Sequence, residues 1–191
     1  MIQEIKKLIK RIKDKEAKLG VIGLGYVGLP LVIRFCQEDF NVLGFDIDPK
    51  KVGRLNKGES YIKHISSEKI KSLRDRKIFE ATSDYSRLKD VDCILICVPT
   101  PLKKNKEPDL SHIESTSDEI ARNLQAGQLV SLESTTYPGT TREILLPKFE
   151  NNGLRVGKDF YLVFSPERED PGNQRYNTKN IPKVVGGITS V

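Results

Sequence analysis

One stretch, residues 18–48, constrains the fold of this chain more than any other. A short apolar run with β-branched residues leads into Gly23, Gly25 and Gly28, which have the spacing G-x-G-x-x-G. Helical apolar spacing follows, and then a second strand pattern that ends in Asp46. This order of strand, glycine turn, helix, strand and acid predicts the first βαβ unit of a dinucleotide-binding fold.

Each part of this motif has a physical role. Gly23 permits the tight turn, Gly25 lets backbone N–H groups approach a pyrophosphate, and Gly28 lets the helix pack closely on the sheet. The N–H groups and the positive dipole end of the helix favour the phosphates. Asp46 can accept from ribose hydroxyls and would repel a 2′-phosphate, which favours NAD over NADP. FAD and a glycine turn that binds no ligand are the alternatives.

Strand and helix patterns alternate along the chain. Strands are predicted at 19–22, 41–45, 77–82, 92–98, 128–132, 160–164 and 184–187, and helices at 2–16, 29–35, from 49, from 66, 84–89, 110–124 and 140–149. Asp48, Asp109 and either Thr140 or Thr141 are the predicted helix caps. The alternation predicts an α/β fold with a doubly wound parallel sheet of the Rossmann type. We expect residues 1–17 to form an N-terminal amphipathic helix and 18–191 the NAD-binding domain.

The net charge of +6 is concentrated in that first helix. Residues 1–19 hold seven basic and three acidic side chains, a balance of +4, which leaves +2 for the rest of the chain. One basic helix is not a nucleic-acid groove. Its apolar stripe predicts packing on the domain or on a partner subunit. A membrane-surface helix is the alternative, but the stripe is short and lacks an aromatic anchor.

The cysteine and histidine patterns indicate neither a metal site nor a disulfide framework. Cys36 lies in a predicted helix, and Cys93 and Cys97 lie four residues apart on one predicted strand, so both should point to the same face. His64 and His112 are interpreted as surface or packing residues. With no signal peptide and no apolar run of bilayer length, we expect a cytoplasmic protein that does not interact with membranes.

Unusual residues follow several of the predicted strands. Ligands bind at the carboxyl ends of the strands in such sheets, so these residues should converge on one site. The predicted cofactor-binding residues are Gly23, Gly25, Tyr26, Val27, Gly28, Asp46, Lys51, Pro99, Thr100, Ser134 and Thr135. Glu167 follows the sixth strand and extends the site beyond the cofactor.

Four segments together resemble one family. GVIGLGYVGLPL, CVPTPL, ESTTYPGTT and FSPEREDPGN followed by PKVVGG are similar to the nucleotide-sugar 6-dehydrogenases of the UDP-glucose/GDP-mannose dehydrogenase family. The SPEREDPGN form is most like the branch that acts on UDP-N-acetylhexosamines, chiefly UDP-N-acetylglucosamine. The resemblance implies oxidation of a sugar C6 alcohol to a carboxylate in two NAD-dependent steps. A cysteine thiolate captures the aldehyde, and the resulting thiohemiacetal is oxidised to a thioester that water hydrolyses.

The resemblance also implies roles for single residues. Glu167 would be the acid–base group that handles water during thioester hydrolysis, and Thr135 would hold water or cofactor near the nicotinamide. Thr100 would lie against the NAD ribose and pyrophosphate, and Arg168 and Glu169 would face the UDP-sugar substrate. From the residues alone, Glu167 could equally be a surface carboxylate after a proline turn.

One departure from the family pattern concerns the catalytic cysteine, which in the family lies in a later glycine-rich segment that nothing here matches. We therefore expect an NAD-binding half without the C-terminal domains, inactive alone and a homodimer or higher homo-oligomer when full length. Alternative functions are a UDP-glucose or UDP-N-acetylmannosamine 6-dehydrogenase, and a dehydrogenase of the 6-phosphogluconate or 3-hydroxyacyl-CoA type. A third is a stand-alone dinucleotide-binding interaction module that docks through its lysine-rich helix.

Overall fold

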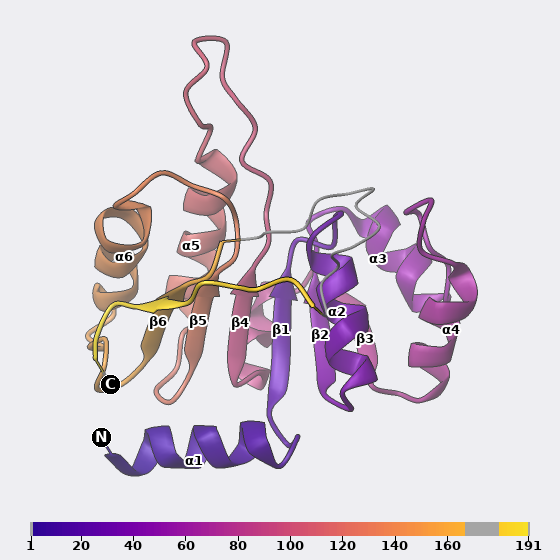
Figure 1. The fold of residues 1–191 in the computed structure, drawn as a ribbon, viewed down its shortest axis with the longest axis horizontal. Helices are drawn as coiled ribbons and strands as arrows, with labels where there is room; N and C mark the ends of the chain where they lie inside the picture. Colours follow the sequence, from indigo (N-terminus) through magenta and orange to yellow (C-terminus); the bar gives the residue numbers. More distant parts are fainter. Residues whose placement is uncertain (1, 167–179, 191) are drawn as a thin grey trace.

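A computed structural model describes residues 2–166 and 180–190, which form a layered α/β fold (Figure 1). The strands are β1 Lys18–Ile22, β2 Asn41–Phe45, β3 Phe79–Thr82, β4 Cys93–Ile96, β5 Leu129–Leu132, β6 Tyr161–Phe164 and β7 Gly186–Gly187. Their order in the sheet is β3-β2-β1-β4-β5-β6-β7. The first six strands are parallel, which confirms the predicted parallel sheet, and the short β7 at its edge pairs antiparallel with β6.

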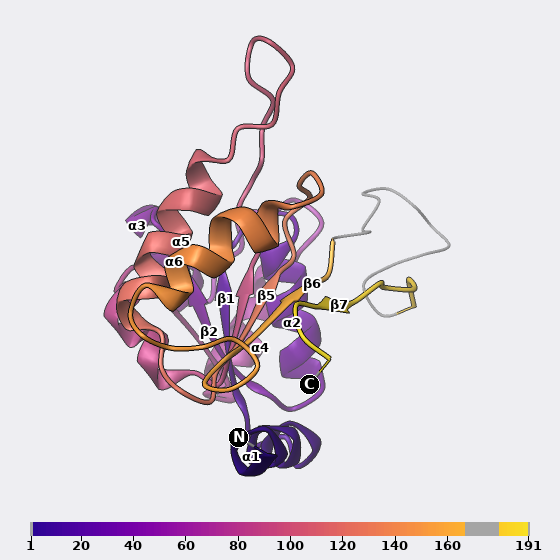
Figure 2. The same cartoon turned by 90° about the vertical axis from the view of Figure 1, so that its left-hand side faces the viewer.

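Helices cover both faces of the sheet. They are α1 Ile2–Lys13, α2 Gly28–Gln37, α3 Pro49–Asn56, α4 Ser67–Asp75, α5 Ser111–Asn123 and α6 Leu146–Glu150, with a 3-10 helix at Tyr85–Asp90 and a π-helical turn at Thr141–Leu145. Figure 2 shows α5 and α6 on one face and α2 on the other. This arrangement confirms the doubly wound Rossmann-type architecture and leaves the carboxyl edge of the strands open.

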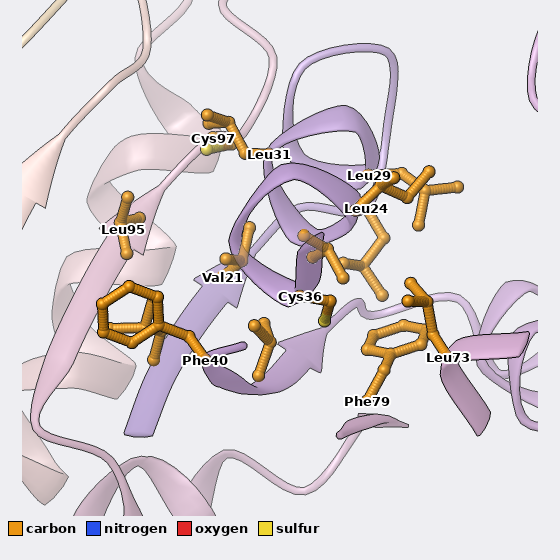
Figure 3. Packing of buried hydrophobic residues seen from close by; sticks show 14 of the residues in the cluster. Val21, Leu24, Leu29, Leu31, Cys36, Phe40, Leu73, Phe79, Leu95 and Cys97 are labelled. Carbon is orange, nitrogen blue, oxygen red and sulfur yellow. The ribbon is translucent and has the colours of Figure 1, made fainter. Parts of the chain in front are cut away.

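The core consists of two apolar clusters, one on each side of the sheet. Neighbouring residues of a strand point to opposite faces, so Val21 belongs to the first cluster and Ile22 to the second. Both are fully buried, as is typical of a central parallel strand. In the first cluster, Cys36 of α2 and Leu73 of α4 lie near the Phe79 ring of β3 (Figure 3).

The N-terminal helix packs on the domain, which is the first of the two arrangements that its apolar stripe predicted. It crosses below the amino ends of the strands (Figure 1), where Leu8 is buried in the first cluster. Arg11 forms an ion pair with Asp92, whose other carboxylate oxygen accepts from the Lys18 N–H at 2.7 Å. In the described part of the chain, no helix combines the length and apolar character that crossing a membrane requires.

Of the predicted helix caps, Asp48 is confirmed, Asp109 lies one residue before the N-cap Leu110 and still accepts from the first turn, and the threonine cap is wrong. The Asp48 side chain accepts from the Lys50 N–H at 2.9 Å, and Asp109 accepts from the Ser111 N–H at 3.0 Å. The Thr140 backbone is helical, and its hydroxyl donates to the Tyr137 carbonyl at 2.9 Å instead of capping the helix. The helix begins there with its π-helical turn. Thr141 lies within that turn, and no hydrogen bond from its side chain is found that would cap the helix.

Candidate cofactor site

The carboxyl ends of β1, β2, β4 and β5 surround a cavity of about 330 Å³. The site therefore lies where the strand order reverses, between β1 and β4, as ligand sites of such sheets do. Most of the predicted cofactor residues line it, namely Gly23, Gly25, Tyr26, Val27, Asp46, Lys51, Pro99, Thr100, Ser134 and Thr135. Gly28 does not line this cavity, because it lies in the helix-packing contact behind the turn.

The three glycines of the turn differ in what surrounds them. Gly23 has a φ of +91°, and a Cβ there would lie 2.8 Å from the Cys97 carbonyl oxygen. A Cβ on Gly28 would lie 1.9 Å from the Gly23 carbonyl oxygen. Apart from the two chain neighbours, no atom of the described residues lies within 4 Å of a Cβ built on Gly25. The fold therefore requires glycine at the first and third positions, whereas the second faces open space that a ligand can enter.

Backbone N–H groups are available at this turn. Those of Gly25, Tyr26 and Val27 donate to no residue that the structure describes. They immediately precede α2, so the positive end of the helix dipole adds to their field. Free N–H groups at a helix N-terminus form a site for anions such as phosphate.

The Asp46 carboxylate lies at the floor of the cavity and is only 5% exposed. Its Oδ2 accepts from the Leu24 N–H at 3.0 Å, and its Oδ1 accepts from the Asp48 N–H at 3.0 Å. Lys51 Nζ lies 3.5 Å from Oδ2. A carboxylate has about four acceptor positions, so these contacts orient Asp46 and still leave capacity for hydroxyl donors.

A second cavity, of about 290 Å³, adjoins the first on the other side of Asp46. The two share Gly23, Asp46, Lys51, Val98 and Pro99. The additional residues of the second cavity are Ile47, Asp48, Tyr85, His112, Ser115 and Thr116. We refer to the two cavities together as the trough. Sequence reasoning did not assign these additional residues to the cofactor site, and the 74% exposure of the apolar Ile47 directly after Asp46 is visible only in the structure.

Hydrogen bonds from hydroxyl groups connect the segment that follows β4 to the segment that follows β5. The Thr100 hydroxyl donates to the Thr135 carbonyl at 2.8 Å, and the Ser134 hydroxyl donates to the Val98 carbonyl at 2.7 Å. Thr100 and Ser134 therefore have structural roles. The exposed Thr135 hydroxyl makes no hydrogen bond with a described residue.

A partly buried ion pair at this end of the trough was not predicted. Glu133 is 4% exposed and lines the first cavity. Its Oε1 accepts from the Ser131 hydroxyl at 2.6 Å, and its Oε2 forms an ion pair with Lys183. The partners lie fifty residues apart in sequence, so no local pattern could have revealed the contact.

The cysteines are buried. Burial raises the pKa values of the Cys36 and Cys93 thiols to about 12 each, so both stay protonated at neutral pH and are poor nucleophiles. The predicted extent of the fourth strand is wrong, because β4 ends at Ile96 and Cys97 lies beyond it in the cavity wall. Cys93 and Cys97 nevertheless belong to the same apolar cluster, as expected for side chains on one face.

The histidine predictions are partly confirmed. His112 is exposed, as expected, and also lines the second cavity. His64 is exposed and stacks on Tyr26, with ring centroids 6.0 Å apart. Glu167, Arg168 and Glu169 lie outside the described residues, and their roles stay predictions.

The sequence is similar to those of known proteins. Residues 17–191 match the NAD binding domain of the UDP-glucose/GDP-mannose dehydrogenase family. The chain is 36% identical over 176 residues to UDP-N-acetyl-D-glucosamine 6-dehydrogenase of Salmonella typhi, which covers 92% of this chain and 40% of that protein. It is 34% identical over 173 residues to UDP-N-acetyl-D-mannosamine dehydrogenase of Pyrococcus horikoshii, covering 90% and 41%.

A solved structure agrees with these sequence matches. The NDP-N-acetyl-D-galactosaminuronic acid dehydrogenase of Methanosarcina mazei Go1 superimposes with a TM-score of 0.86 at 34% identity, covering 98% of this chain and 42% of that one. The chain therefore spans about two fifths of the length of the relatives it matches. It belongs to the UDP-glucose/GDP-mannose dehydrogenase family, of which it is the NAD-binding domain.

Proposed function

We propose that this chain binds NAD in the trough around Asp46, as the cofactor half of a UDP-N-acetylhexosamine 6-dehydrogenase. The observation that carries the proposal is the open space over Gly25 between the buried Asp46 carboxylate and backbone N–H groups that donate to no described residue. This combination suits a pyrophosphate next to a ribose.

In this proposal, different residues of the trough bind different parts of the dinucleotide. The N–H groups of residues 25–27 donate to the pyrophosphate, and Asp46 accepts from the adenosine ribose hydroxyls. The same carboxylate repels a 2′-phosphate, which favours NAD over NADP. The adenine lies toward Ile47 and His112, and the nicotinamide lies toward Thr135. When bound, NAD supplies the hydride acceptor for oxidation of the sugar.

The identity of the sugar rests on the sequence of one segment. The SPEREDPGN form supports UDP-N-acetylglucosamine, and the Salmonella relative acts on that substrate by its name. UDP-N-acetylmannosamine and UDP-glucose are the alternatives, the first of which matches the name of the Pyrococcus relative. We propose Glu167 as the acid–base residue and Arg168 and Glu169 as sugar-nucleotide contacts. Since Cys36, Cys93 and Cys97 are all buried, none of them suits the covalent step, and we expect this chain alone to be inactive on UDP-sugars.

A calorimetric titration of the chain with NAD and then NADP tests the proposal. We expect micromolar-range NAD binding, weaker NADP binding, and a loss of this preference in Asp46→Ala. Asp109→Ala is the matched control, because Asp109 also accepts from a backbone N–H but does not line the trough. A folded chain that binds neither nucleotide would refute the proposal. Production of NADH by this chain with a UDP-sugar would refute the expected inactivity.

A further inference from the structure

The backbone N–H and carbonyl of Leu24 both form hydrogen bonds with side chains from distant parts of the chain. Leu24 lies between Gly23 and Gly25 and is fully buried. Its N–H donates to Asp46 Oδ2 at 3.0 Å, and its carbonyl oxygen accepts from the Tyr61 hydroxyl. The first contact involves a predicted cofactor residue, whereas the second has no assigned function.

The Tyr61 hydroxyl is presented by an anchored segment between α3 and α4. Ile62 and Ile65 are buried in the first apolar cluster, and the Ser60 N–H donates to the Ser67 hydroxyl at 3.0 Å. Burial raises the pKa of Tyr61, and the charges of Asp46 and Asp48 raise it further. The phenol therefore remains a proton donor throughout the physiological pH range.

The contact determines the direction of a neighbouring N–H group. The peptide bond between Leu24 and Gly25 is trans and planar, so the Leu24 carbonyl and the Gly25 N–H point in opposite directions. Fixing the carbonyl toward Tyr61 therefore directs the N–H to the other side. Gly25 lines the first cavity and Tyr61 does not, which is consistent with an N–H held toward the cavity.

The segment between α3 and α4 makes two further contacts, one with the glycine turn and one with Lys51. The His64 ring stacks on Tyr26, the residue after Gly25. Lys51 Nζ lies 5.8 Å from the centroid of the Tyr61 ring and 3.5 Å from Asp46 Oδ2. One aromatic ring therefore contacts both the turn and the cation beside the ribose-binding carboxylate.

We propose that Tyr61 is a positioning residue for the cofactor. Its hydroxyl orients the peptide between Leu24 and Gly25, so that the Gly25 N–H meets the pyrophosphate without reorganisation. The inference rests on the proposed binding of NAD in the trough. It adds a residue from outside the glycine motif to the determinants of affinity.

Tyr61→Phe tests the inference, because it removes the hydroxyl and keeps the ring. Tyr161→Phe is the control, since Tyr61 is partly buried and Tyr161 is buried, but the Tyr161 hydroxyl has no hydrogen-bond partner among the described residues. NAD and adenosine are titrated into both variants and the wild type, and thermal unfolding confirms that each is folded. Adenosine carries no phosphate, so a general loosening of the site would weaken both ligands, whereas misdirection of the Gly25 N–H weakens only NAD.

We expect Tyr61→Phe to raise the Kd for NAD by about tenfold, the effect of losing one hydrogen bond, and to change the Kd for adenosine by less than about twofold. Tyr161→Phe should bind both ligands like the wild type. Wild-type NAD affinity in a folded Tyr61→Phe would overturn the positioning role and leave the proposed function intact. An equal loss of NAD and adenosine affinity would also overturn it. Failure of the wild-type chain to bind NAD would refute both proposals.

Discussion

Replacing Gly25 with alanine should separate the stability of the glycine turn from its capacity to bind NAD. The substitution adds one methyl group where no atom of the described chain lies within 4 Å, and the φ of Gly25 is outside the left-handed region. Alanine therefore fits the backbone without strain. It also restricts the unfolded chain, so the free energy of unfolding should stay the same or rise by up to about 1 kcal/mol.

The effect of Gly25→Ala on binding should be large, because the methyl group occupies the space from which a phosphate oxygen approaches. A phosphate must come within about 2.9 Å of a backbone nitrogen to accept a hydrogen bond. Hydrogen bonds to charged groups contribute about 1.5–3 kcal/mol each. Losing one of them raises the Kd for NAD by about 10- to 150-fold.

Gly28→Ala is the contrasting variant. Its Cβ would lie 1.9 Å from the Gly23 carbonyl oxygen, a backbone atom that cannot move without shifting β1 or α2. We expect a loss of about 3 kcal/mol in the free energy of unfolding. Urea unfolding and calorimetric titration with NAD measure both quantities for each variant. The reasoning is refuted if Gly25→Ala is as unstable as Gly28→Ala, or if it binds NAD like the wild type.

Three further predictions concern buried charges and thiols. Asp46→Ala should abolish the preference for NAD over NADP in titrations and lower the free energy of unfolding by about 2 kcal/mol, because two backbone N–H groups lose their acceptor. Lys183→Met should lower the free energy of unfolding, measured in urea, by about 2–4 kcal/mol, because the Glu133 carboxylate stays buried without its cation. The double variant that also carries Glu133→Gln should recover part of this loss. Stability should fall above pH 9, because the unfolded thiols of Cys36 and Cys93 ionise near 9.0 while burial raises their folded pKa values to about 12. The folded state then binds more protons, so each thiol contributes a loss of about 1.4 kcal/mol per pH unit, and replacing either by alanine should reduce that slope in urea unfolding at pH 8 to 10.5.

Some parts of the site could be predicted from the sequence because they are formed by residues close together in the chain. The glycine turn, Asp46 and the Asp48 cap all lie within residues 18–50, where spacing alone sets the order of strand, turn and helix. Parallel strands then bring their carboxyl ends to one edge, so the convergence of Thr100 and Ser134 with the turn follows from the strand order.

The missed features depend on contacts between residues far apart in the chain. The ion pair of Glu133 and Lys183 joins two segments across fifty residues, and the bond from Tyr61 to Leu24 spans 37. Neither pair has a spacing that a periodic pattern could reveal. The wrong cap at Thr140 has a different cause, because its hydroxyl has a nearer acceptor in the Tyr137 carbonyl.

Asp46 shows why binding and stability must be measured separately in this site. Its carboxylate accepts from two backbone N–H groups before any ligand arrives, so folding fixes the orientation in which it meets the ribose. A fixed acceptor needs no reorganisation on binding, which favours affinity. It also means that removing Asp46 releases Leu24, and with it the turn that faces the pyrophosphate. An affinity loss in Asp46→Ala therefore combines a lost ribose contact with a displaced turn, whereas Gly25→Ala changes only the space above the turn. If both variants weaken NAD but only Asp46→Ala changes the ratio of NAD to NADP affinity, the carboxylate selects the nucleotide and the glycine turn supplies its phosphate site.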